Sequence, residues 1–77
     1  MFEKVIEILS RFTETDISEI TMDSKLVLDL GLNSFDVVNV VTSFEDEFDI
    51  EIPNEDIKGL KTVEDVVKYI DGLIDNS

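Results

Sequence analysis

The chain has 77 residues, of which 19 are acidic and 6 are basic, so its formal net charge at pH 7 is −13. It contains neither histidine nor cysteine, which removes the commonest general base, disulfides and thiolate metal sites. The negative surface repels nucleic-acid phosphates and attracts basic patches on other proteins. We therefore expect a single domain over residues 1–77 that is not an enzyme and binds no nucleic acid.

No segment has the features of a targeting signal or a membrane span. Charged residues at positions 3, 4, 7 and 11 interrupt the apolar residues at the start of the chain. No apolar run approaches the roughly 20 residues that a membrane-spanning helix needs. We therefore expect a cytoplasmic monomer without stable membrane insertion.

The first helix is expected over about residues 2 to 14, where apolar side chains recur at spacings of three and four. These are Phe2, Val5, Ile6, Leu9 and Phe12. A long connection follows, from about residue 16 to 33, and long connections are often functional. Its apolar residues are Ile17, Ile20, Leu26, Leu28, Leu30 and Leu32. We expect this loop to lie across the helices and to contribute to the core.

The second helix is expected over residues 34 to 49, and Pro53 stops the pattern soon after it. Its stripe is the cleanest in the chain and consists of Val37, Val40, Val41, Phe44 and Phe48. A short helical turn follows at residues 54 to 57, with Asn54 as its predicted N-cap.

The last helix is expected to begin after Thr62, an N-cap that forms a capping box with Asp65. Its stripe consists of Val63, Val66, Val67, Ile70 and Ile74. Together these patterns predict an all-α fold. It would be a small four-helix bundle, made of three main helices and one short helix, with a long loop between the first two main helices.

Two apolar residues near the start of the second helix fall outside its core stripe. At about 100° per residue, Phe35 and Val38 point away from the stripe, as does Thr42. Glu45, Asp46 and Asp49 flank them on the same side. This arrangement indicates either a docking ridge for a protein partner or a surface that the long loop covers.

Ser34 raises a question about the start of the same helix. Asn33 with Asp36 fits a capping box, which would leave the Ser34 hydroxyl free, but Ser34 could equally be the cap itself. The positive end of the helix dipole favours a phosphate at this position. As a nucleophile Ser34 would need a base, and only Lys25, Lys58 or a carboxylate is available. We therefore expect another enzyme to modify Ser34, and we exclude hydrolase chemistry.

Residues 30–36, Leu-Gly-Leu-Asn-Ser-Phe-Asp, resemble the attachment motif of acyl carrier proteins, which usually reads Leu-Gly-x-Asp-Ser-Leu-Asp. The segments Phe-Glu-Asp-Glu-Phe at 44–48, Ile-Pro at 52–53 and Thr-Val-Glu-Asp-Val at 62–66 are also similar to that family. The resemblance extends from Val5 to Ile70, so it covers nearly the whole chain.

The resemblance implies that Ser34 carries a 4′-phosphopantetheine arm, installed from coenzyme A by a phosphopantetheinyl transferase. The arm's thiol would hold acyl groups as thioesters in fatty acid or related biosynthesis, such as polyketide or specialised lipid synthesis. Acyl-synthesising and acyl-transferring enzymes would dock through basic patches. The docking residues implied by the family are Phe35, Asp36, Val38, Glu45 and Asp46.

Asn33 and Phe35 depart from the family motif, which has Asp and Leu at these positions. Asn caps a helix as well as Asp does, but the lost charge predicts slower modification or the need for a different transferase. It also favours one alternative function, an unmodified acidic adaptor that binds basic partners. A calcium-binding module is a weaker alternative, because residues 45–49 lack the ligand pattern of a calcium loop. No metal site is expected.

Overall fold

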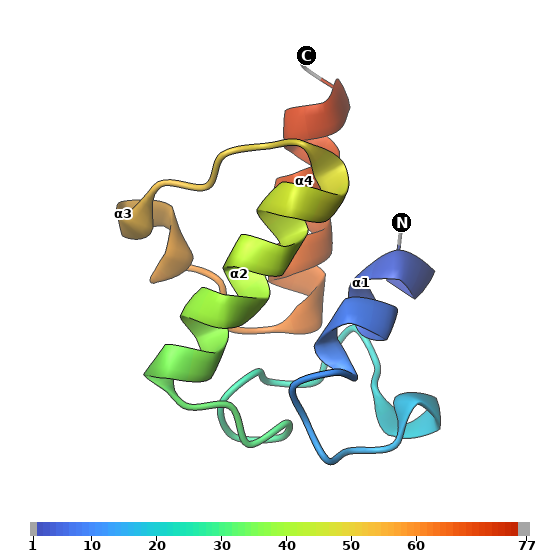
Figure 1. The fold of residues 1–77 in the computed structure, drawn as a ribbon. Coiled ribbons are helices and arrows are strands. Elements are labelled where there is room, and N and C mark those ends of the chain that lie inside the picture. The colour runs from blue at the N-terminus through green and yellow to red at the C-terminus, as the bar shows by residue number, and fades with distance from the viewer. Residues whose placement is uncertain (1, 76–77) are drawn as a thin grey trace.

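Figure 1 shows the computed structural model, which describes residues 2–75. The helices are α1 (Phe2–Leu9), the 3₁₀ turn η1 (Ile17–Glu19), α2 (Ser34–Phe48), α3 (Asn54–Ile57) and α4 (Val63–Asp75). Within the described residues there is no strand, and the only β-type pairing is an isolated bridge between Lys25 and Thr62. The predicted all-α fold, with three main helices and one short helix, is confirmed.

The core lies where α1, α2 and α4 meet. α1 contacts both α2 and α4, and the long connection of residues 10–33 runs along one end of the bundle (Figure 1). The predicted α2 stripe is confirmed, with Val40, Val41 and Phe44 buried and Val37 and Phe48 partly buried against the core. The α4 stripe is confirmed except at Ile74, which is 38% exposed near the end of the helix.

α1 is shorter than predicted, because it ends at Leu9 rather than near residue 14. The hydroxyl of Ser10 donates to the carbonyl of Glu7 at 2.6 Å. The next backbone bonds tighten to an i to i−3 pattern, with the Phe12 N–H donating to the Leu9 carbonyl at 3.0 Å. Ile8 is fully buried although it lies off the predicted stripe, because α1 packs between two helices and buries a wider face.

The prediction that the long loop contributes to the core holds for Ile20, Leu26, Leu30 and Leu32, which are buried. It is wrong for Ile17 and Leu28, which are exposed. Ile17 is the first residue of the turn η1, which was not predicted and which Asp16 caps by accepting the Ser18 N–H at 3.0 Å. Leu28 lies in a turn closed by the Lys25 carbonyl, which accepts the Asp29 N–H at 2.9 Å.

The two C-terminal helices begin in different ways. The predicted capping box of α4 is confirmed: Thr62 Oγ1 accepts the Asp65 N–H at 3.1 Å, and Asp65 Oδ2 accepts the Thr62 N–H at 3.1 Å. Asn54 is not the N-cap of α3, contrary to the prediction. Pro53 holds that position in an extended conformation without a side-chain hydrogen bond, and its carbonyl accepts the Asp56 N–H at 3.0 Å.

Candidate functional site

The start of α2 is fixed by a reciprocal pair of hydrogen bonds. Asn33 Oδ1 accepts the Asp36 N–H at 2.8 Å, and Asp36 Oδ2 accepts the Asn33 N–H at 3.4 Å. Asn33 has an extended backbone, as an N-cap residue requires. Asn33 is therefore the cap, and the alternative in which Ser34 caps its own helix is wrong.

Ser34 is consequently the first residue inside the helix, and its side chain is exposed. Among residues 2–75, no hydrogen bond uses the Ser34 hydroxyl. The backbone N–H groups of Ser34 and Phe35 likewise have no partner within this part of the chain. The site therefore combines a free hydroxyl, two free N–H donors and the positive end of a 15-residue helix.

The backbone just before the serine is anchored on both sides. Leu30 and Leu32 are buried, and the Leu32 N–H donates to the Leu26 carbonyl at 3.1 Å. Between them Gly31 adopts a left-handed conformation with φ of 70°, which glycine tolerates far better than residues with a Cβ. Two buried leucines and a tight glycine turn thus hold Ser34 at one place on the surface.

The ridge beside Ser34 is open to solvent. Phe35 is 74% exposed and Val38 is 50% exposed, while Thr42 is also exposed and donates its hydroxyl to the Val38 carbonyl at 3.0 Å. The alternative in which the long loop covers these residues is therefore wrong. An exposed phenylalanine and valine leave apolar surface for a partner to contact.

The predicted docking acids differ in how free they are. Asp46 is exposed, whereas Asp36 and Glu45 are half-buried. Asp36 takes part in the α2 capping box, and Glu45 Oε2 accepts the Ile52 N–H at 2.9 Å. These two carboxylates therefore hold the ends of α2 as well as contributing negative charge beside it.

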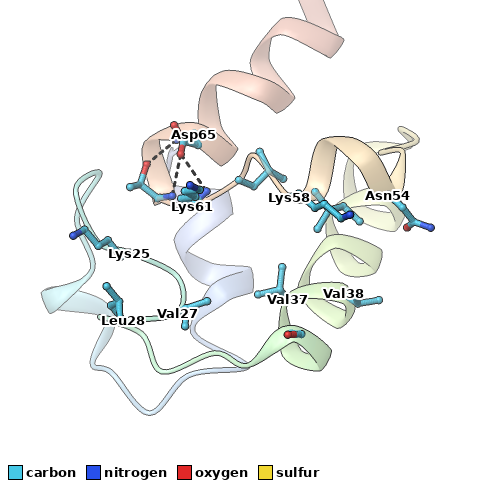
Figure 2. A pocket seen from close by; sticks show the side chains of 13 residues that line it. Lys25, Val27, Leu28, Val37, Val38, Asn54, Lys58, Lys61 and Asp65 are labelled. Atoms are coloured by element: carbon cyan, nitrogen blue, oxygen red, sulfur yellow. Dashed lines mark hydrogen bonds between the residues drawn. The ribbon is translucent and has the colours of Figure 1, made fainter.

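Ser34 also lies on the edge of a groove of about 910 Å³, which was not predicted from the sequence. Figure 2 shows Val27 and Leu28 on its loop side and Val37 and Val38 on its α2 side. Ile57 of α3 and Leu60 add apolar lining, and the remaining lining residues are Lys25, Asn54, Lys58, Lys61, Thr62 and Asp65. The run Leu26–Val27–Leu28 was the available signal, because three consecutive apolar residues in a loop cannot all face inward.

Two further observations concern metals and membranes. In the part of the chain that the structure describes, no group of three or more acidic side chains is arranged to hold a metal ion. Within residues 2–75, no helix combines the length and apolar character needed to cross a bilayer.

Comparison with known proteins identifies the family to which the chain belongs. The family described as "phosphopantetheine attachment site" matches residues 3–70. The chain belongs to the acyl carrier proteins. An acyl carrier protein of Clostridium perfringens is 46% identical over 70 residues, which are 91% of this chain and 92% of that protein. One from Campylobacter jejuni subsp. doylei is 39% identical over 72 residues, or 94% of each chain.

A solved structure gives the same result. That of a proposed acyl carrier protein from Mycobacterium tuberculosis has a TM-score of 0.80 and 39% identity, covering 87% of this chain and 89% of the other. Acyl carrier proteins are carriers rather than enzymes, and their prosthetic group is a covalently attached 4′-phosphopantetheine. This carrier therefore interacts with a modifying transferase and with biosynthetic enzymes. The free hydroxyl of Ser34 and the adjoining groove fit a phosphopantetheine group.

Proposed function

We propose that Ser34 is the residue of this acyl carrier protein that bears the phosphopantetheine arm. The observation that carries the proposal is the capping box. The Asn33 side chain accepts the Asp36 N–H at the start of α2, so the Ser34 hydroxyl is left exposed and without a hydrogen bond. The oxygen is then accessible to a transferase that joins it to phosphopantetheine from coenzyme A. When attached, the arm supplies the thiol that a chain without cysteine lacks.

The start of α2 suits a phosphodiester for electrostatic reasons. A group attached at Ser34 Oγ lies next to the free N–H groups of Ser34 and Phe35. Backbone N–H groups and the helix dipole at an N-terminus stabilise a neighbouring negative charge. The acidic character of the rest of the chain therefore does not prevent an anionic group from being held here.

Partner enzymes would approach the exposed ridge of Phe35 and Val38. The apolar side chains offer contact area, and the carboxylates of Asp36, Glu45 and Asp46 steer basic patches toward it. Both the transferase and the acyl-transferring enzymes need to reach Ser34, so a surface adjoining it serves both. The docking set is Phe35, Asp36, Val38, Glu45 and Asp46.

We infer the cellular setting from the same family. The chain would act as a cytoplasmic monomer whose residues 1–77 form one carrier domain, in fatty acid or related biosynthesis. The relatives named above are called acyl carrier proteins, which supports this setting.

Intact-mass measurement after co-expression with phosphopantetheinyl transferases tests the attachment. The wild-type chain and the control Ser43→Ala, which alters a different serine of α2, should each gain the mass of one arm. Ser34→Ala should gain nothing and keep its helical circular dichroism. Modification of Ser34→Ala would refute the assignment. If no transferase modified the wild-type chain, the unmodified acidic adaptor would be the better function.

A further inference from the structure

A threonine just beyond the end of α1 contacts the loop that leads into Ser34. The Thr13 hydroxyl donates to the Leu30 carbonyl at 2.6 Å, although the two residues are 17 positions apart in the chain. Thr13 Oγ1 also accepts the Thr15 N–H at 3.1 Å. A hydroxyl has one proton to donate and two lone pairs that accept, so the Thr15 bond leaves that proton available for the Leu30 carbonyl.

The local backbone explains why Thr13 can make this contact. α1 ends at Leu9, and the N–H groups of Arg11 and Phe12 donate to the carbonyls three residues earlier, at 3.1 and 3.0 Å. In a continuous helix, a threonine hydroxyl commonly bonds a carbonyl of the preceding turn of its own helix. The early end of α1 therefore frees the Thr13 hydroxyl to bond a distant segment.

The acceptor lies in a closed turn, residues 25–32, which we call the pre-serine turn. The N–H groups of its last three residues donate to carbonyls earlier in the turn, at 3.0, 3.1 and 3.1 Å. Its first part is tied to the segment before α4, because the Leu26 N–H donates to the Lys61 carbonyl at 2.9 Å. Thr13 ties its last part to the segment that follows α1, so the turn is held at both ends.

Only one residue, Asn33, separates the pre-serine turn from Ser34. Asn33 is the N-cap of α2, so a shift of the turn would pass directly to the start of that helix and to the Ser34 hydroxyl. Misplacement of a reacting group by about 1 Å can slow a reaction by about 100-fold. The contact from Thr13 therefore bears on the reactivity of Ser34, although Thr13 lies far from it in the chain.

We propose that Thr13 is a positioning residue for attachment of the phosphopantetheine arm. Its hydroxyl fixes the pre-serine turn, and the turn holds Ser34 Oγ where the transferase needs it. In the attachment step, Ser34 Oγ forms a bond to the phosphorus that bears the pantetheine and gives its proton to a base of the transferase. The bond from that phosphorus to the bridging oxygen breaks, and the nucleotide half of coenzyme A leaves with that oxygen. This inference rests on attachment at Ser34 and adds a residue outside both the motif and the docking set.

Three variants separate positioning from a general effect on stability. Thr13→Val closely keeps the shape of the side chain but removes the hydroxyl, whereas Thr13→Ser keeps the hydroxyl. The matched control is Ser10→Ala, because the Ser10 hydroxyl also donates to a backbone carbonyl at 2.6 Å, that of Glu7 in α1. The control therefore removes a hydrogen bond of the same kind and length without touching the pre-serine turn.

Amide hydrogen exchange, measured by NMR on the unmodified protein, tests whether Thr13 holds the turn. The readout is the exchange rate of the Gly31 and Leu32 N–H groups divided by that of Val41 in the core of α2. Thr13→Val should raise this ratio about fivefold, because loss of one hydrogen bond favours local opening of the turn. Ser10→Ala and Thr13→Ser should change it by less than about twofold.

Steady-state kinetics with the transferase that modifies the wild-type chain test the effect on attachment. Thr13→Val should lower kcat about tenfold, because Ser34 is less well placed. The KM for the carrier should change by less than about twofold, because the docking ridge of Phe35 and Val38 is unaltered. Thr13→Ser should restore kcat, and Ser10→Ala should leave both constants near those of the wild-type chain.

The outcomes separate this inference from the attachment itself. If the wild-type chain gains no arm, or if Ser34→Ala gains one, the attachment at Ser34 fails and the positioning role fails with it. If attachment occurs at Ser34 but Thr13→Val keeps its kcat, shares its loss with Ser10→Ala or is not rescued by Thr13→Ser, only the positioning role is overturned. Should Thr13→Val fail to fold by circular dichroism, Thr13→Ala replaces it, and unfolding of both variants would assign Thr13 a purely structural role.

Discussion

The phenol hydroxyl of Tyr69 on α4 donates a 2.5 Å hydrogen bond to Oδ2 of Asp56 on α3. α3 has only four residues, no side-chain cap and no fully buried residue, so few other contacts hold it in place. Because Ile57 and Lys58 at the end of α3 line the groove beside Ser34, this bond helps to set the position of one groove wall.

The same bond makes the ionisation of Tyr69 a probe of α3. Hydrogen bonding to Asp56, aided by burial and by the charges of Asp56 and Glu55, raises the pKa of Tyr69 to about 12. Since the folded pKa lies above the ordinary value of 10.0, the stabilisation is complete below pH 10 and is lost as the pH rises toward 12.

We therefore expect the phenolate absorbance of the folded protein to rise with a midpoint near pH 12. The chain has one tyrosine and no tryptophan, so the signal reports Tyr69 alone. Asp56→Asn should move the midpoint back toward 10.0, because the carboxylate charge is gone. Tyr69→Phe should lower the free energy of unfolding by about 1 kcal/mol. A phenolate midpoint near pH 10.0 in the wild-type protein would show that the hydrogen bond from Tyr69 to Asp56 is not formed in solution.

The capping box of α4 predicts sensitivity to acid. Backbone hydrogen bonds from Lys61 and Thr62, with the charge of Lys68, hold the pKa of Asp65 below its ordinary value of 3.8. The stabilisation from ionised Asp65 is therefore present above pH 3.8 and is lost as the pH falls through the lower folded pKa. Asp65→Asn should flatten this part of the pH–stability curve, measured by urea unfolding. Asp71→Asn, which changes an exposed acid of the same helix outside the capping box, is the matched control variant.

Asn33 separates helix capping from transferase recognition. Asn33→Ala should lower the free energy of unfolding by about 1 kcal/mol, because the N-cap bond to Asp36 is lost. Asn33→Asp should keep that stability, since both residues cap well, while restoring the charge that the family usually has beside the serine. We expect faster modification of Asn33→Asp by a transferase, measured as the rate of mass gain. Equal rates of modification for Asn33→Asp and the wild-type chain would show that the transferase does not recognise this charge.

Two phenylalanines of α2 should behave in opposite ways. Phe44 is 0% exposed and Phe35 is 74% exposed. Phe44→Ala should cost about 3–5 kcal/mol through loss of burial and creation of a cavity, which is comparable with the whole stability of a small domain. Phe35→Ala should cost about 0.5 kcal/mol or less but weaken binding to the transferase and to partner enzymes. Thermal unfolding and titration calorimetry measure the two effects, and a fully stable Phe44→Ala would contradict the assigned core.

Most of the helices could be predicted because their signals are local. The α2 stripe repeats at helical spacing, and Asn33–Asp36 and Thr62–Asp65 place acceptors three residues from the N–H groups that they serve. The outward position of Phe35 and Val38 follows from the same helical geometry. The end of α1 could not be predicted in this way, because the residues after Leu9 keep an apolar spacing while the backbone tightens into turns.

The sequence by itself determined the starts of α2 and α4 and the acidic surface, since each depends on neighbours a few residues apart or on composition, but it left open whether the Ser34 hydroxyl is free. Only the tertiary structure decided which loop residues are buried and where the groove lies. Lys25 and Thr62 are far apart in the chain and form an isolated backbone bridge, and Val27 and Val37 come together to line one groove. Such long-range contacts depend on how α1, α2 and α4 pack, and no local periodicity encodes them.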